Sequence, residues 1–149
     1  DKHHELAGQP LGQELSKLGE EVYRFRHTDA GQTSSTLVAV YRKGNDYFLQ
    51  AAHLSLHDYY GSQGKEGLKK VTRPLRVDEW KEIQEKLKRL DFWQMKEPQP
   101  TVVLDGTTWT LEAAAGKKYR AVTIPVVEAG PFRAVCLDLW RRSGLLMGG

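Results

Sequence analysis

Apolar and polar residues alternate with a period of two along several segments of this chain. The clearest example runs over Leu104–Ile124, where Trp109, Leu111 and Ala113 alternate with polar residues before a break at Gly116. A second alternating run follows the break. Alternation is typical of a strand with one buried face, and two such runs around a short Gly-containing break predict a β-hairpin.

Three earlier segments show the same alternation or a composition rich in β-branched and aromatic residues. They are Glu21–His27, Thr36–Tyr41 and Tyr47–Leu54, and Gly44 lies in a tight turn between the last two. β-Branched and aromatic side chains favour strands. Because the connections are short, we expect these strands to pair antiparallel as a meander.

Two segments have the period of an amphipathic helix instead. Asp78 is a good N-cap for a helix over Glu79–Leu90, and Pro131 suits the first turn of a second helix that Gly144 would end. The predicted apolar stripe of the first helix is Trp80, Ile83, Leu87 and Leu90. That of the second helix is Phe132, Val135, Cys136, Leu139 and Trp140.

The order of these elements predicts an α+β fold. An antiparallel sheet with two main helices packed on one face, in the order β-β-β-α-β-β-α, forms a two-layer sandwich. We expect residues 1–149 to make a single domain, with residues 1–10 as a disordered tail and a short helix over Leu11–Leu18. A hairpin followed by a helix occurs twice, a weak sign of duplication.

Composition excludes a few classes and selects none. The chain is 40% hydrophobic and 28% charged, without an apolar run long enough to cross a bilayer. Its net charge of +3 is too small to indicate nucleic acid alone. Cys136 is the only cysteine, so no intrachain disulfide can form, and we expect it in the core. No phosphate loop, nucleophile motif or Cys/His cluster indicates catalysis or a cofactor.

The segment Leu56–Val71 is the longest predicted irregular link. Its Gly, Ser and Gln content argues against regular structure, and loops of this length are often functional. Tyrosine is favoured at interfaces, and a basic run suits an acidic partner protein. We therefore predict partner contacts at Tyr59, Tyr60, Lys65, Lys69 and Lys70.

Two other functions compete with protein binding. His53, His57 and Asp58 lie close together in the sequence and would suit a metal-dependent enzyme, although a loop weakens the meaning of the spacing. The basic run over residues 65–76 would suit a nucleic-acid binder, but no stacking motif accompanies it.

Glu112 lies in the first strand of the predicted hairpin, and we expect it to have a structural rather than a catalytic role. We expect it to form a cross-strand ion pair with Arg120 on the return strand of the hairpin.

The second half of the chain carries a recognisable pattern. The strings DFW at Asp91–Trp93, LDGTTWTLE at Leu104–Glu112 and KYRAV at Lys118–Val122 resemble small exported bacterial proteins and lipoproteins of unassigned function. This resemblance covers roughly Val77–Leu145. It implies an envelope location and no catalytic residue.

From these observations we expect a non-enzymatic protein-binding module of the bacterial cell envelope. A toxin-neutralising immunity protein or an enzyme inhibitor would be its concrete form. The location would be periplasmic or extracytoplasmic, and removal of a leader is one explanation for a first residue, Asp1, that is not methionine. No metal or cofactor is expected.

Overall fold

The computed structural model describes residues 15–29, 34–55, 67–96, 108–124 and 130–145. These residues form an antiparallel sheet and two helices. The strands are β1 (Glu21–Thr28), β2 (Ser34–Lys43), β3 (Asp46–Ser55), β4 (Leu68–Leu75), β5 (Thr108–Ala115) and β6 (Lys118–Ile124). The helices are α4 (Val77–Leu90) and α5 (Pro131–Ser143).

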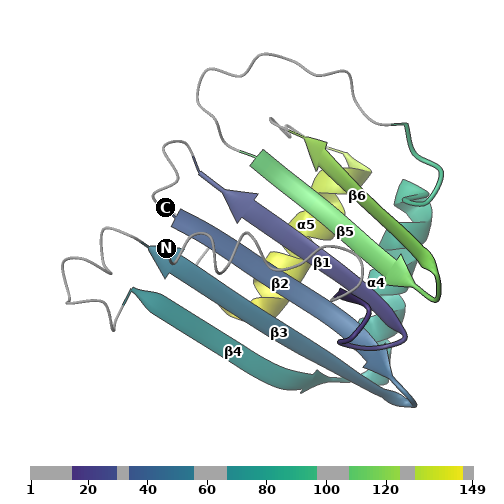
Figure 1. Ribbon diagram of the computed structural model, residues 1–149, viewed down its shortest axis with the longest axis horizontal. Helices are drawn as coiled ribbons and strands as arrows, with labels where there is room; N and C mark the ends of the chain where they lie inside the picture. The colour runs from purple at the N-terminus through teal and green to yellow at the C-terminus, as the bar shows by residue number, and fades with distance from the viewer. Residues whose placement is uncertain (1–14, 30–33, 56–66, 97–107, 125–129, 146–149) are drawn as a thin grey trace.

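The first strand lies in the middle of the sheet and joins its two halves. The strand order is β4-β3-β2-β1-β5-β6, so β4 and β6 form the two edges (Figure 1). β1 pairs with β2 in a meander, as expected, and also with β5, with Arg24 opposite Glu112. The predicted hairpin is confirmed as β5 and β6, with Ala115 opposite Lys118.

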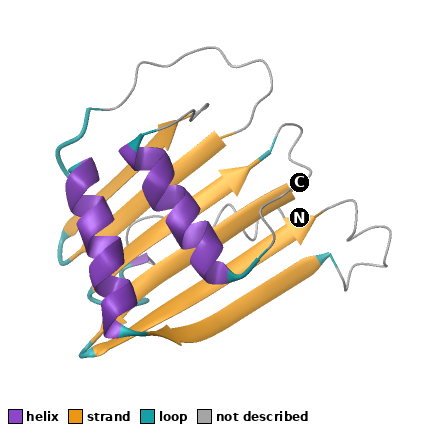
Figure 2. Ribbon diagram, turned by 180° about the vertical axis from the view of Figure 1, so that it is seen from behind, coloured by secondary structure: helices purple, strands orange, loops and turns teal. Residues whose placement is uncertain are grey.

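Both helices lie on one face of the sheet, which confirms the predicted α+β sandwich (Figure 2). The core between the layers contains the apolar stripes predicted for both helices, which are buried except for Leu90, a half-buried residue at the end of α4. Trp109 of β5 meets Trp140 of α5 with ring centroids 6.2 Å apart, and Trp80 of α4 stacks on Tyr47 of β3 at 4.9 Å. Cys136 is fully buried among these side chains, as predicted.

Two sequence-based predictions about element boundaries are wrong. Residues 68–71, assigned to the irregular link, belong to strand β4, which makes four strands before α4 rather than three. Helix α4 begins at Val77, and Arg76 rather than Asp78 is its N-cap. The first turn is stabilised instead by Glu79, whose carboxylate accepts the backbone N–H of Arg76 at 2.9 Å.

The sheet face away from α4 and α5, which we call the outer face, carries a second apolar cluster. Leu15, Val22, Tyr41 and Ala114 are buried there together. Gly19 lies between Leu15 and β1, and a Cβ at this position would come 2.3 Å from the carbonyl oxygen of Arg42. Only glycine allows so close an approach of two backbone segments.

Candidate functional site

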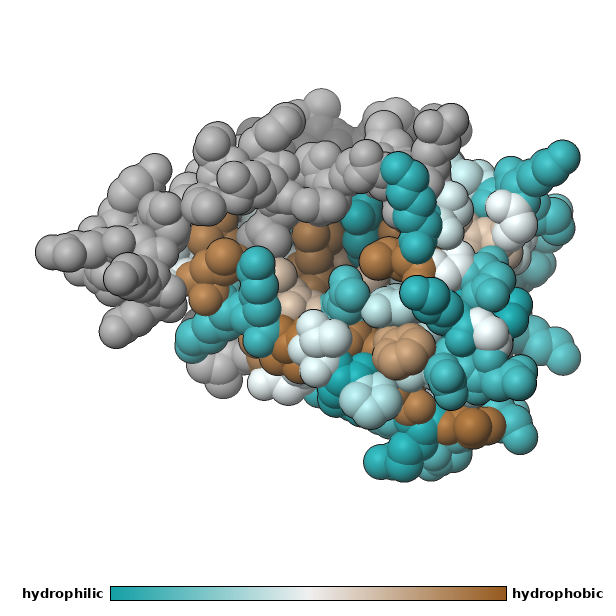
Figure 3. Space-filling model, turned by 60° about the horizontal axis from the view of Figure 1, so that its bottom comes forward, coloured by the Kyte–Doolittle hydropathy of each residue, from teal (hydrophilic) through white to brown (hydrophobic). Residues whose placement is uncertain are grey.

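Strand β4 brings two of the predicted contact residues to an edge of the sheet. Lys69 and Lys70 are both exposed, and their side chains point to opposite faces because they are neighbours in a strand. Tyr59, Tyr60 and Lys65 lie outside the described residues. Figure 3 turns the side of the molecule that carries β4 forward, and hydrophilic side chains surround scattered hydrophobic ones there.

The outward backbone groups of β4 follow from one hydrogen bond. The N–H of Ser55 donates to the carbonyl of Gly67 at 2.9 Å, so residues 55 and 67 form a hydrogen-bonded pair. Such pairs alternate with non-hydrogen-bonded ones along an antiparallel ladder. Residues 69, 71, 73 and 75 therefore bond to β3, and the backbone groups of residues 68, 70, 72 and 74 point away from it.

Pro74 fits this register. It has no N–H, and it faces Phe48 in a non-hydrogen-bonded pair, so its presence removes no bond within the sheet. The free edge of β4 then offers backbone N–H groups at Leu68, Lys70 and Thr72. Among the described residues, no strand pairs with this edge.

Arg73, which also belongs to the predicted basic run, has a structural role. Arg73 donates to both oxygens of Glu79, at 3.0 and 3.2 Å, and to the carbonyl of Arg142 at 3.0 Å. These bonds connect β4 with both helices. The pKa of Glu79 is lowered to about 2, chiefly by the hydrogen bond from Arg73. In the described part of the run, Arg73 is therefore structural, whereas Lys69, Lys70 and Arg76 are exposed.

Glu112 forms a different ion pair from the one predicted. The β5–β6 register places Arg120 opposite Ala113, so Arg120 and Glu112 lie on opposite faces of the sheet. Glu112 instead accepts two bonds from Arg24 of β1, at 3.0 and 2.9 Å. Arg120 donates to the backbone carbonyls of Phe92 and Met95.

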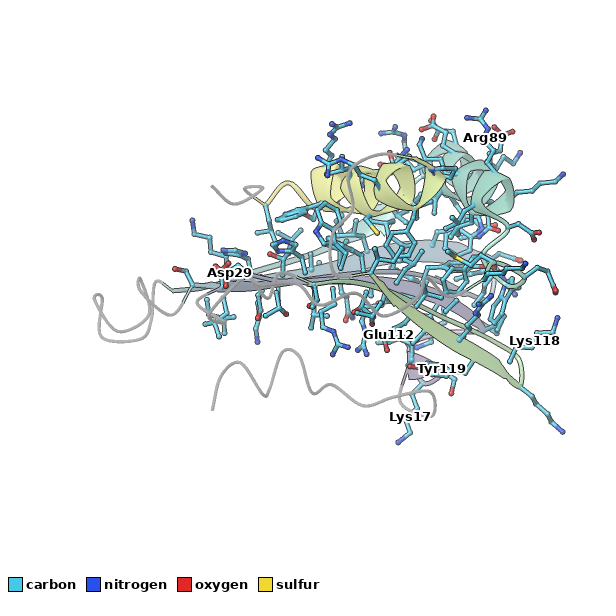
Figure 4. The ribbon with its side chains drawn as sticks, turned by 90° about the horizontal axis from the view of Figure 1, so that it is seen from above. Lys17, Asp29, Arg89, Glu112, Lys118 and Tyr119 are labelled. Carbon is cyan, nitrogen blue, oxygen red and sulfur yellow. The ribbon has the colours of Figure 1, made fainter. Side chains whose placement is uncertain are left out.

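The Arg24–Glu112 pair lies on the outer face and is nevertheless buried. Glu112 is 0% exposed and Arg24 6% exposed. Tyr119 of β6 donates a third hydrogen bond to Glu112 at 3.0 Å, and Figure 4 shows both side chains on the side of the sheet opposite the helices. Partial burial and the nearby carboxylate raise the pKa of Tyr119 to about 12, so the hydroxyl remains a donor at neutral pH.

The predicted metal-binding residues are not brought together in the described part of the chain. His53 lies in β3, where its Nδ1 is 2.7 Å from the hydroxyl of Thr36, and His57 and Asp58 lie outside the described residues. Within the described ranges, no group of three or more His, Cys, Asp or Glu side chains is arranged to hold a metal ion. Burial raises the pKa of the Cys136 thiol, which makes it a poor nucleophile at neutral pH.

A cavity that the sequence analysis did not predict lies beside the C-terminal half of α4. Its volume is about 410 Å³, within the range of small-ligand sites. Tyr23 and the turn after α4 contribute aromatic side chains to its wall. Gln84, which also lines the cavity, donates a hydrogen bond from its side-chain amide to the carboxylate of Glu21 at 3.0 Å. Its lining residues are Tyr23, Gln84, Glu85, Leu87, Lys88, Asp91, Phe92 and Trp93. None of these coincides with a predicted contact residue.

No known family model matches the chain, and no curated protein is similar enough to count as a relative. The resemblance to small exported proteins therefore stays a prediction. Neither helix in the described ranges is long and apolar enough to span a membrane.

Proposed function

We propose that this protein is a non-catalytic protein-binding module that accepts an extended, acidic segment of a partner protein along the free edge of β4. The observation that carries the proposal is the edge position of β4 together with the exposure of Lys69 and Lys70. Addition of a strand to a sheet edge is a recurring mode of peptide recognition, in which backbone hydrogen bonds supply affinity and side chains supply specificity.

The charge pattern of β4 supports an acidic partner rather than any partner. Lysine and proline on edge strands discourage indiscriminate pairing. The proline has no N–H to donate to an incoming strand, and the lysines form ion pairs only with an acidic one. A strand with a carboxylate opposite Lys70 gains a cross-strand ion pair instead. Pro74 limits the available hydrogen bonds to the stretch before it, which would fix the register of the bound segment.

The concrete form of this function that we propose is a toxin-neutralising immunity protein or an enzyme inhibitor of the bacterial cell envelope. In such proteins the partner is blocked by occupation of its surface, and a rigid sheet edge suits that role. Tyr59, Tyr60 and Lys65 remain proposed contacts next to this edge in the sequence, beside Lys69 and Lys70.

A titration with a synthetic peptide tests the binding edge directly. The probe is a short extended peptide in which glutamate and valine alternate, and its binding is followed through the amide NMR signals of the labelled protein. We expect shifts concentrated at Leu68–Thr72, and at least about tenfold weaker binding to the Lys70→Glu variant, since opposite charges become like charges. Higher salt should weaken binding to the unmodified protein.

Two controls separate edge recognition from general attraction to a basic protein. The same charge reversal at the opposite edge, Lys118→Glu, should leave the affinity unchanged. A peptide with lysine in place of glutamate should not bind. Equal affinities of the unmodified and Lys70→Glu proteins, or shifts spread evenly over the surface, would refute the proposal.

A further inference from the structure

The opposite edge of the sheet differs from β4 in its backbone and in its charges. The N–H of Gly116 donates to the carbonyl of Glu20 at 3.4 Å, which makes residues 20 and 116 a hydrogen-bonded pair in the β1–β5 ladder. By alternation, residues 118, 120, 122 and 124 bond to β5. The backbone groups of Tyr119, Ala121 and Thr123 therefore point outward, and none of these residues is proline.

The two basic side chains of β6 do not protect this edge. The side chain of Arg120 lies on the face of the sheet that carries the helices, where it donates to the carbonyls of Phe92 and Met95. Lys118 has its Nζ 5.9 Å from the ring centroid of Trp93. Tyr119 and Thr123, whose side chains share the outer face, are uncharged and exposed, and Tyr119 is one of two exposed large hydrophobic residues identified in the described chain.

We propose that β6 pairs antiparallel with β6 of a second copy of this chain, which joins the two sheets into one continuous sheet. In the register centred on Ala121, that residue faces itself across a two-fold axis and Tyr119 faces Thr123 of the partner subunit. These outward-facing residues would exchange hydrogen bonds in three pairs.

This register is selected by length and charge. It pairs the whole of β6, because Lys118 at one end of the strand faces Ile124 of the partner subunit at the other end. Arg120 faces Val122 of the partner subunit, so no two like charges lie directly opposite each other. A shift that brings residue 120 opposite its own copy would place two guanidinium groups together, which is unfavourable. A shift in the other direction leaves Tyr119 without a partner within the strand.

The same operation is unfavourable at β4. A symmetric pairing of that strand over its full length would place Lys69 opposite Arg73 of the second copy and would meet Pro74, which has no N–H to donate. The two edges therefore suit different partners: Pro74 removes a hydrogen bond when β4 meets its own copy, whereas the β6 register contains no proline and no directly opposed like charges.

Sedimentation velocity over a range of protein concentrations tests the dimer. A single strand pair buries less area than a typical stable complex, so we expect self-association between about 10 µM and about 1 mM. The Ala121→Pro variant should be monomeric over that range, because proline removes an outward N–H and no bond to β5. The matched variant Thr72→Pro, which makes the same change at the edge of β4, should dimerise as the unmodified protein does.

Cysteine cross-linking tests the register. Ala121→Cys places two thiols across the axis at the spacing that a disulfide needs, whereas Thr123→Cys places them about four residues apart along the strand. Cys136 is 0% exposed and does not compete. We expect an oxidised dimer of the first variant and none of the second. A monomer at every concentration, a dimer lost in Thr72→Pro but kept in Ala121→Pro, or equal cross-linking at both positions would overturn the proposal.

Discussion

At the scale of single residues, the ion pair between Arg24 and Glu112 places two charges out of contact with water. Two opposite charges with side chains 7% and 0% exposed have lost most of their hydration. Such a pair is stable only when its hydrogen bonds are well made, and here Arg24 binds both carboxylate oxygens while Tyr119 adds a third bond. The net stabilisation from the pair is small, but the loss of one member is expensive.

Removal of one charge should therefore destabilise the protein far more than removal of both. We expect Glu112→Gln to lower the free energy of unfolding by about 3 kcal/mol or more, since the buried guanidinium of Arg24 loses the opposite charge of Glu112. The double variant Arg24→Met with Glu112→Leu should lose less than the sum of the two single changes. Urea denaturation of the unmodified protein, Arg24→Met, Glu112→Leu and the double variant measures this coupling, and the same measurement on Glu112→Gln tests the loss of one charge.

The variant Tyr119→Phe gives a reference value for the loss of free energy of unfolding when a single hydrogen bond to Glu112 is removed. It removes one hydrogen bond from a partly exposed group and should cost about 1 kcal/mol. If Glu112→Gln costs no more than Tyr119→Phe, the pair is solvated and the description of it as buried is wrong.

At the scale of elements, the sequence predicted those whose pattern is local and did not predict those that depend on distant partners. Alternation in β5 and β6 and the apolar stripes of both helices arise because each element has one buried face. β4 reads LKKVTRPL and was missed because an edge strand with exposed lysines and a proline has little apolar pattern. The β1–β5 ladder was missed because nothing in either strand alone specifies its neighbour.

The candidate sites follow the same rule. The exposure of Lys69 and Lys70 could be predicted from their basic context, but their position on a strand edge could not. Glu112 was assigned the wrong partner because Arg24 is far away in the sequence. The cavity beside α4 has no local signal, since it is formed by β1, α4 and the turn that follows α4.

Glu79 connects three elements, and its ionisation should control the acid stability of that junction. It binds Arg73 of β4, the backbone N–H of Arg76, and Arg142 of α5 at 3.5 Å. Its pKa of about 2 lies below the ordinary value of 4.5, so the carboxylate stabilises the folded state fully above pH 4.5. This stabilisation, on the order of 2 kcal/mol, should disappear as the pH falls from 4.5 to 2.

Thermal or urea denaturation between pH 2 and pH 7 measures this contribution. The difference in the free energy of unfolding between the unmodified protein and Glu79→Gln should shrink steadily below pH 4.5. Glu82→Gln is the matched control, because Glu82 also binds Arg142 but its side chain is 57% exposed. A pH-independent difference for Glu79→Gln would show that its carboxylate has an ordinary pKa.

At the scale of the whole molecule, β1 holds the two halves of the sheet together while β4 and β6 face outward at its edges. Phe25 of β1 contacts Trp109 of β5 and Trp140 of α5, with ring centroids 5.6 and 5.5 Å apart, so the central strand also connects the sheet to the helix layer. The β1–β5 ladder joins residues that are far apart in the sequence. We therefore expect the central strand to open only when the whole protein unfolds.

Amide hydrogen exchange would map this organisation residue by residue. In dilute protein the outward amides of Lys70, Thr72 and Ala121 should exchange rapidly, while their inward neighbours in the same strands exchange slowly, because only the latter are bonded within the sheet. The amide of Phe25 should exchange at the rate set by global unfolding. At concentrations where the dimer forms, Ala121 should become protected and Lys70 should not. Uniform exchange along β4 or β6 would contradict the assigned hydrogen-bond register. Equal protection of both edges at high concentration would contradict the proposal that the protein self-associates through β6 and not through β4.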